Sequence, residues 1–157
     1  MRALLLSLTL CVSACASLPE VDLPDLPDLP VPGVEGDVRD RPFMPTGDYP
    51  VPPNVERLIG PEDCRGSTLA AVSADLPRYP AREYVRGRQG WVVVRFDVAQ
   101  PGEVENIRIA RSVPGGGFNR VARQAVSDWQ FQPLSGVDRL QNCVVMFEFR
   151  AGEVRIR

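Results

Sequence analysis

The chain has 157 residues, a length that favours a single domain with a modest core. All 18 basic side chains are Arg, His and Lys are absent, and the formal net charge is −2. Without His, the residue types exclude the usual nucleophile–base triads and give the cysteines no His partners for a metal site. We therefore expect neither an enzyme nor a cofactor or metal site.

The first 14 residues have the pattern of an export signal. Arg2 precedes an apolar run over residues 3–12, which is shorter than the roughly 20 residues that span a bilayer. The sequence Val-Ser-Ala-Cys that ends at Cys15 fits a lipobox, which predicts lipidation of Cys15 and an outer-membrane lipoprotein facing the periplasm. The alternative is ordinary cleavage after the Ala-Cys-Ala of residues 14–16, which predicts a soluble periplasmic protein. Either route exports the chain, so we expect no nucleic-acid partner.

Residues 15–53 are predicted to be a disordered tether. Ten prolines fall within residues 19–53, and the triplet Leu-Pro-Asp occurs twice in succession from Leu23. A proline at every third position favours polyproline II, which rises about 3.1 Å per residue and would hold a domain away from a membrane. The tether carries eight acidic residues against two Arg, whereas residues 54–157 carry 15 Arg and 12 acidic residues. The sequence thus predicts an acidic spacer and a slightly basic domain over residues 54–157.

The start of the domain has the weakest pattern. We expect a short helix over residues 67–74 and a second one that begins at Pro80, where proline is tolerated, and ends near Gly87. Cys64 and Cys143 are the two cysteines that would remain after export. An even pair in an oxidising compartment favours a disulfide, with two separate buried thiols as the alternative.

A hairpin is predicted from Trp91 to residue 113. Apolar residues at every second position of 92–98 predict a strand with one buried face, which puts Trp91 on the outward face. A Pro-Gly pair at 101–102 supplies the residues of a type II turn. The apolar positions change phase near Glu105, where we expect a bulge.

A helix and two strands complete the domain. Apolar residues from Phe118 to Trp129 fall at i, i+3, i+4, i+7, i+8 and i+11, the stripe of an amphipathic helix, which Pro133 would end. Residues 142–150 alternate as a strand with an unusually apolar second face, and residues 153–157 form a last strand. The sum predicts an α+β fold, a small antiparallel β-sheet with one main helix packed across it.

The order of these features resembles one known family. The chain has Tyr-Pro at 79–80, Gly-Trp-Val-Val-Val-Arg-Phe-Asp-Val at 90–98, the Pro-Gly turn, the helical stripe and Trp-Gln-Phe-Gln-Pro at 129–133. This order is similar to the C-terminal domain of the TonB family, periplasmic modules that contact outer-membrane transporters. The resemblance runs from about Leu76 to the C-terminus. It implies a TonB C-terminal-like fold and a module that binds a partner chain.

The resemblance also implies where a partner would bind. In TonB domains the last strand pairs with a short peptide of an outer-membrane transporter, and an edge strand can bind an extended peptide in this way. By position the corresponding residues are Gly152, Glu153, Val154, Arg155, Ile156 and Arg157. Alternation predicts that Val154 and Ile156 face the core. The residues beside the Tyr-Pro pair contribute in the family as well, which adds Arg78 and Tyr79, although Leu76 departs from the Gln of typical members.

A group of basic side chains offers a further candidate surface: Arg78, Arg82, Arg86 and Arg88. These side chains either meet carboxylates of a partner or form the solvated face of a short helix.

Two functions are compatible with the resemblance. The first is a membrane-anchored module of the TonB type, linked to transmembrane transport through outer-membrane transporters or another periplasmic peptide. The second is a structural lipoprotein of the envelope that binds cell wall or an assembly partner. Energy-transducing members of the family carry a membrane helix with a His. Because the sequence shows neither, we do not expect this domain to harvest the proton gradient alone.

Overall fold

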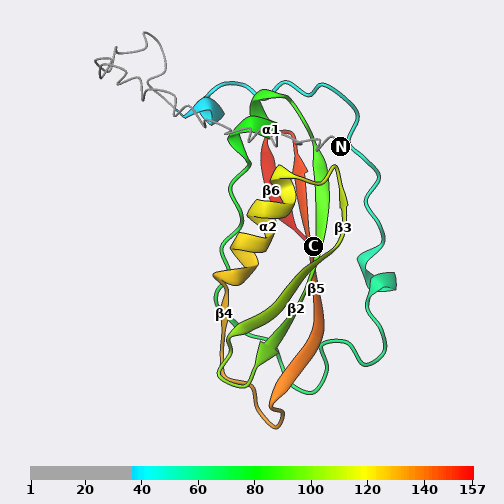
Figure 1. The fold of residues 1–157 in the computed structure, drawn as a ribbon, viewed down its shortest axis with the longest axis vertical. Coiled ribbons are helices and arrows are strands. Elements are labelled where there is room, and N and C mark those ends of the chain that lie inside the picture. Colours follow the sequence, from blue (N-terminus) through cyan, green and yellow to red (C-terminus); the bar gives the residue numbers. More distant parts are fainter. Residues whose placement is uncertain (1–36) are drawn as a thin grey trace, which may run out of the picture. The chain divides into compact units, whose positions relative to one another are not determined.

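The computed structural model describes residues 37–157, all within one compact unit. The predicted export signal, Cys15 and the Leu-Pro-Asp repeats lie outside the described residues. Figure 1 shows the elements in chain order. The helical segments are η1 (Val38–Asp40), η2 (Val55–Leu58), α1 (Ala81–Val85) and α2 (Gly117–Ser127). The strands are β1 (Ala71–Ser73), β2 (Gly90–Ala99), β3 (Val104–Val113), β4 (Gln130–Phe131), β5 (Arg139–Arg150) and β6 (Glu153–Ile156).

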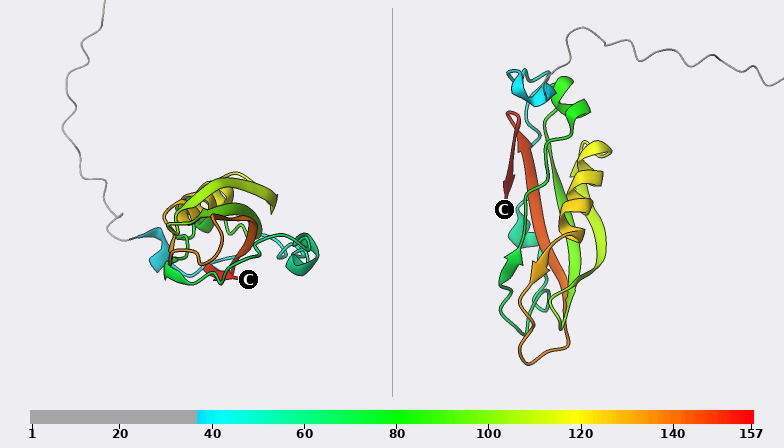
Figure 2. Two further views of the ribbon diagram at one scale, coloured as in Figure 1. Left: turned by 90° about the horizontal axis from the view of Figure 1, so that it is seen from below. Right: turned by 90° about the vertical axis from the view of Figure 1, so that its left-hand side faces the viewer.

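Four antiparallel strands form the main sheet in the spatial order β3-β2-β5-β6, and β1 pairs with β4 in a second sheet of two strands. The helix α2 lies across one face of the main sheet, as the two views of Figure 2 show. The predicted α+β fold, with a small antiparallel sheet and one main helix across it, is confirmed. Because β6 and β3 end the strand order, they form the two edges of this sheet.

The β2–β3 hairpin follows its sequence pattern. Gly102 in the turn has a φ of 92°, and a Cβ there would lie 2.0 Å from the carbonyl oxygen of Phe131, so a side chain would not fit. The register of the two strands shifts next to Asp97, and Asn106 on β3 has a φ of 50°. These two features confirm the bulge predicted near Glu105.

The main core lies between the sheet and α2. The apolar residues of 92–98 and 143–149 that share this face are buried, and Phe118 begins the buried stripe of α2. The prediction that this helix continues to Pro133 is wrong. It ends at Ser127, because the next residues leave the helix and pair with β1 as the short strand β4.

The opposite face of the main sheet is also buried, so the prediction of a single buried face is wrong. Three side chains of this face are at most 6% exposed: Trp91, Val93 and Met146. They are covered by residues 49–59, which we call the strap. The strap contributes three partly buried side chains to this second cluster: Tyr49, Val55 and Leu58. Trp91 is therefore a core residue, and the strap accounts for the apolar second face of β5.

Polar contacts hold the C-terminal end of the strap on the sheet. Arg95 of β2 donates a hydrogen bond to the carboxylate of Asp63 at 2.9 Å and another to the carbonyl oxygen of Leu58. The same carboxylate accepts a hydrogen bond from the backbone N–H of Gly60 at 2.8 Å. One guanidinium and one carboxylate thus tie the backbone on both sides of Gly60 to β2.

A disulfide joins Cys64, the residue after Asp63, to β5. Cys64 and Cys143 are bonded, with their Cα atoms 4.5 Å apart, and the N–H of Cys64 donates to the carbonyl oxygen of Gln141 at 2.7 Å. The helix predicted for residues 67–74 is absent from this described segment. That prediction is wrong because the backbone there forms β1 and pairs with β4.

Residues 37–53, which the sequence assigns to the tether, pack on the domain. The ring of Phe43 lies 5.2 Å from the ring of Tyr84, in an edge-to-face arrangement. A Cβ on Gly87 would lie 1.9 Å from the carbonyl oxygen of Met44, so the chain passes directly over this glycine. The packed part of the chain therefore begins well before residue 54.

Candidate functional site

The short strand β6 forms one edge of the main sheet. It follows β5 through a tight turn in which Ala151 and Gly152 have φ values of 52° and 82°. Glu153 and Arg155 are exposed and form an ion pair of 3.1 Å. Figure 1 shows β6 beside β5, and no strand of the described residues pairs with its other side. Such an edge presents N–H and C=O groups that an extended peptide can bond.

The hydrogen bonds with β5 decide which backbone groups of β6 point outward. The backbones of Met146 and Arg157 exchange two hydrogen bonds, each 2.9 Å long. In an antiparallel pair, bonded positions alternate with non-bonded ones, so Arg155 also bonds with β5. Val154 and Ile156 lie at the positions between. Their N–H and C=O groups therefore point away from β5.

The side chains of β6 follow the predicted alternation only in part. Val154 packs against the main core, whereas Ile156, which lies opposite Phe147 on the same face, is 47% exposed. The guanidinium of Arg157 pairs with the buried carboxylate of Glu148 at 3.3 Å and holds the end of β6 on β5. Ile156 thus adds an exposed apolar side chain to the open edge.

The side chain of Tyr79 lies inside the domain. It is 3% exposed, and its ring packs edge-on against the rings of Phe118 and Phe149 at 5.6 Å each. Its hydroxyl donates to the carbonyl oxygen of Arg88, and burial raises the pKa of Tyr79 above its ordinary value. Tyr79 therefore supports the surface from within, while Arg78 beside it is exposed.

The four Arg that the sequence groups together do not share one surface. Arg78 and Arg82 line a hollow of about 540 Å³ between α1 and the start of α2, together with Arg120 of α2. Arg88 instead pairs with Glu83 at 3.4 Å. Sequence reasoning missed the contribution of Arg120. Its position in the helical repeat predicts only that it is exposed to solvent, and only the fold brings it beside α1.

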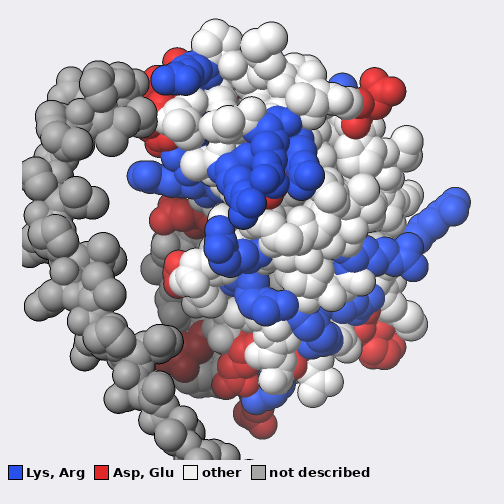
Figure 3. Space-filling view, turned by 45° about the horizontal axis from the view of Figure 1, so that its top comes forward, with Lys and Arg blue, Asp and Glu red and all other residues white. Residues whose placement is uncertain are grey.

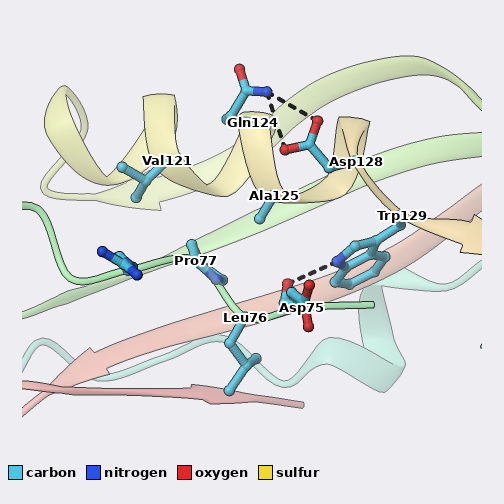
Figure 4. Close-up of a pocket in the computed structure, with 9 residues that line it drawn as sticks. Asp75, Leu76, Pro77, Val121, Gln124, Ala125, Asp128 and Trp129 are labelled. Atoms are coloured by element: carbon cyan, nitrogen blue, oxygen red, sulfur yellow. Dashed lines mark hydrogen bonds between the residues drawn. The ribbon is translucent and has the colours of Figure 1, made fainter. Parts of the chain in front are cut away.

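A second hollow, of about 260 Å³, lies between residues 75–78 and α2 (Figure 4). Val121 and Trp129 give it an apolar lining, and the indole N–H of Trp129 donates to the backbone carbonyl of Asp75 at 2.9 Å. Leu76, the departure from the family pattern, lines this hollow and is 47% exposed. Leu76 thus gives this hollow an apolar side chain at the position where the family pattern has a polar Gln.

Neither a metal cluster nor a membrane-spanning helix is found in the part of the chain that the structure describes. Within residues 37–157, no three potential ligands gather into a metal site. No helix in the same range has the length and apolar character needed to cross a bilayer. The groups that could contact a partner are the outward backbone groups of β6, the guanidinium groups beside α2, and the apolar side chains of the groove beside Trp129.

Comparisons with known proteins find relatives of the central part of the domain. Residues 75–151 match the family described as Gram-negative bacterial TonB protein C-terminal. Protein TonB of Yersinia enterocolitica is 32% identical over 92 residues, 59% of this chain and 33% of that protein. Protein TonB of Salmonella typhimurium is 33% identical over 100 residues, 62% of this chain and 38% of that protein. The solution structure of the Pseudomonas aeruginosa TonB CTD has a TM-score of 0.49 and 29% identity, covering 59% of this chain and 96% of that one.

The chain spans about a third of the length of the two curated relatives, 33% of one and 38% of the other. The family match begins just before the Tyr-Pro pair and ends at the turn before β6, so it includes α1, α2 and the strands β2 to β5. The strap and β6 lie outside it. Residues 75–151 are thus similar to the C-terminal domain of TonB proteins.

Proposed function

We propose that this domain is a binding module of the TonB type, linked to transport across the outer membrane, which binds an extended peptide of an outer-membrane transporter as an added strand at β6. The observation that carries the proposal is the direction of the backbone groups of Val154 and Ile156, away from β5. The match of residues 75–151 to the TonB C-terminal family supports the link with transport that the sequence resemblance implies.

The proposal includes an anchor on the membrane. The lipobox that ends at Cys15 supports a lipoprotein of the outer membrane facing the periplasm, with the acidic Pro-rich residues as a spacer before the domain. Because the 157 residues contain no His, we assign the supply of energy to another protein.

Backbone pairing at β6 alone would give a weak complex. Two residues with one N–H and one C=O each allow at most four hydrogen bonds. Each contributes about 0.5–1.5 kcal/mol net, while association costs at least about 4 kcal/mol of lost freedom. Burial of the exposed side chain of Ile156 adds to the sum. A stable complex therefore needs a further contact elsewhere on the domain.

Photocrosslinking in intact cells tests the proposal. A photoreactive residue in place of Arg155, whose side chain is 74% exposed, should capture peptides of an outer-membrane transporter. The same residue in place of the exposed Arg111 on β3, at the opposite edge of the sheet, is the matched control and should capture far less.

Two results would count against strand addition at β6. Equal capture from both edges would show that β6 has no special role. Capture of cell-wall fragments or assembly proteins alone would favour the scaffolding lipoprotein instead, and co-sedimentation with purified cell wall would then be expected.

A further inference from the structure

The outer side of α2 carries a continuous surface that shares no residue with β6. Three hollows adjoin along it because they have lining residues in common. The hollow between α1 and the start of α2 shares Arg78 and Val121 with the groove beside Trp129. It shares Gly116 and Arg120 with a third hollow farther along the helix. We call this region the α2 surface.

Exposed guanidinium groups dominate the first part of the α2 surface. Four of them make no ion pair with any residue of 37–157: Arg78, Arg82, Arg120 and Arg123. Figure 3, in which the top of Figure 1 is tilted toward the viewer, shows basic side chains in the middle of the face and acidic ones mostly toward its margin. An accumulation of like charge favours a partner of opposite sign.

Two of the nearby acidic groups already have partners. Asp37 contacts the guanidinium of Arg39 at 2.6 Å, and Glu83 contacts that of Arg88 at 3.4 Å. The hydrogen bonds from Arg39 hold the pKa of Asp37 below its ordinary value, and the charge of Arg78 lowers it further. Glu83 itself lines the hollow beside Gly117, and Asp75 and Asp128 line the groove, so carboxylates of the domain compensate part of the positive charge of the α2 surface.

The start of α2 adds to this positive charge. Its N-cap is Gly116, which makes no side-chain capping hydrogen bond. The first N–H groups of a helix have no acceptor within the helix and carry partial positive charge. Gly116 and Gly117 line the same hollow as Arg82 and Arg120, so this end of the helix and the guanidinium groups face one space.

The other part of the α2 surface is apolar and then acidic. Figure 4 shows Val121 at one end of the groove and Asp128 and Trp129 at the other. The carboxylate of Asp128 accepts hydrogen bonds of 3.1 and 3.2 Å from the amide of Gln124. An occupant would therefore place acidic groups at the start of α2 and apolar side chains farther along.

We propose that the α2 surface binds an extended acidic segment of a partner protein, with carboxylates at Arg78, Arg82 and Arg120 and apolar side chains in the groove beside Trp129. Guanidinium groups can bind carboxylates through two parallel hydrogen bonds. A peptide segment fits better than a small anion, because the charge and the apolar lining run along the helix and do not converge on one point. Joined to strand pairing at β6, this contact would raise the affinity of a partner that carries both elements.

Fluorescence anisotropy of the full chain with a short labelled peptide that repeats Leu-Glu-Ser tests the proposal. The native chain should bind this peptide, more weakly as salt is added, and should not bind the version with Gln in place of Glu. Changing Arg82→Glu and Arg120→Glu together should lower the affinity by about tenfold or more, since two attractive contacts become repulsive.

Matched variants make the result specific. Arg57→Glu with Arg111→Glu changes the net charge equally at exposed Arg residues outside the α2 surface, and should bind the peptide nearly as well as the native chain. Ile156→Pro, which alters only the edge of β6, should also bind the peptide normally. A failure of strand addition at β6 can therefore be distinguished from a failure of binding at the α2 surface. If circular dichroism shows that Arg82→Glu with Arg120→Glu does not fold, the corresponding pair of Gln substitutions replaces it, with a smaller expected loss.

Three outcomes would overturn the proposal. The first is a native chain that does not bind the Glu peptide. The second is an equal loss of affinity in both pairs of Glu variants, which would indicate a response to overall charge. The third is displacement of the peptide by an equal concentration of inorganic phosphate, which would indicate a site for small anions.

Discussion

Met146 and Arg157 exchange two backbone hydrogen bonds of 2.9 Å, and this pair sets the phase of the whole edge strand. Arg155 lies two residues earlier, so its N–H also points into the sheet although its side chain points to water. The N–H groups of Val154 and Ile156 point the other way. At Arg155, therefore, the side chain points to water while the N–H bonds with β5. Loss of the N–H at this position should affect stability, whereas loss of the N–H at Val154 or Ile156 should affect binding of a guest strand.

Ile156→Pro should abolish binding of a guest strand while leaving the domain folded. The substitution removes an outward N–H that makes no hydrogen bond with β5. Arg155→Pro should instead lower the free energy of unfolding by about 1 kcal/mol, because it removes a hydrogen bond of the sheet. Thermal unfolding by circular dichroism and the yield of crosslinked partner measure the two effects.

Arg155→Ala is the control for this pair, since it keeps the backbone and removes only an exposed side chain. It should fold and bind nearly as the native chain does. If Ile156→Pro captures its partner as efficiently as the native chain, pairing at this edge is not the mode of binding.

Loss of the bond between Cys64 and Cys143 should destabilise the domain substantially. The two residues are 79 positions apart, and the chain-entropy model gives about 3–5 kcal/mol for a loop of that size. Cys64→Ser should lower the free energy of unfolding in urea by this order, and the native chain in reductant should behave alike. Alkylation of the denatured, unreduced chain should label neither cysteine; two labelled thiols would show that the bond does not form.

The elements that could be predicted carry a local signal in the sequence. The Pro-Gly turn and the alternation of residues 92–98 predict the β2–β3 hairpin, and the stripe from Phe118 predicts α2. The end of α2 could not be predicted from Pro133. The helix stops where residues 130–131 pair with β1, a partner that lies far away in the sequence.

The strap could not be predicted because its apolar residues have no period. Tyr49, Val55 and Leu58 are separated by prolines and polar residues, and they are partly buried because they pack on an apolar face of β2 and β5. The one feature of the sequence that indicates a covering segment is the apolar second face of residues 142–150. The α2 surface is a similar case, since Arg120 joins Arg78 only through packing of the helix.

A shortened chain that begins at residue 61 should be far less stable than one that begins at residue 37. It keeps the family stretch and the disulfide but loses the strap, which exposes Trp91 and its neighbours. Each apolar side chain that loses full burial costs about 1.5–3 kcal/mol, so we expect a loss of several kcal/mol and a red-shifted Trp fluorescence. Equal melting temperatures for the two chains would mean that the strap does not stabilise the sheet.

The carboxylate of Asp63 should make stability depend on acid pH. The hydrogen bond from the N–H of Gly60 and then the one from Arg95 hold the pKa of Asp63 below its ordinary value. A carboxyl whose pKa is lowered by folding stabilises the native state above its unfolded pKa of about 3.9, and this contribution disappears as pH falls through the folded pKa. The unfolding free energies of the native chain and Asp63→Asn should therefore differ most at neutral pH and converge below about pH 4. Asp138→Asn, at an exposed position before β5, is the control and should not change stability at neutral pH. If the difference in unfolding free energy between the native chain and Asp63→Asn persists or grows under acid conditions, the contacts with Arg95 and Gly60 do not depend on the charge of the carboxylate.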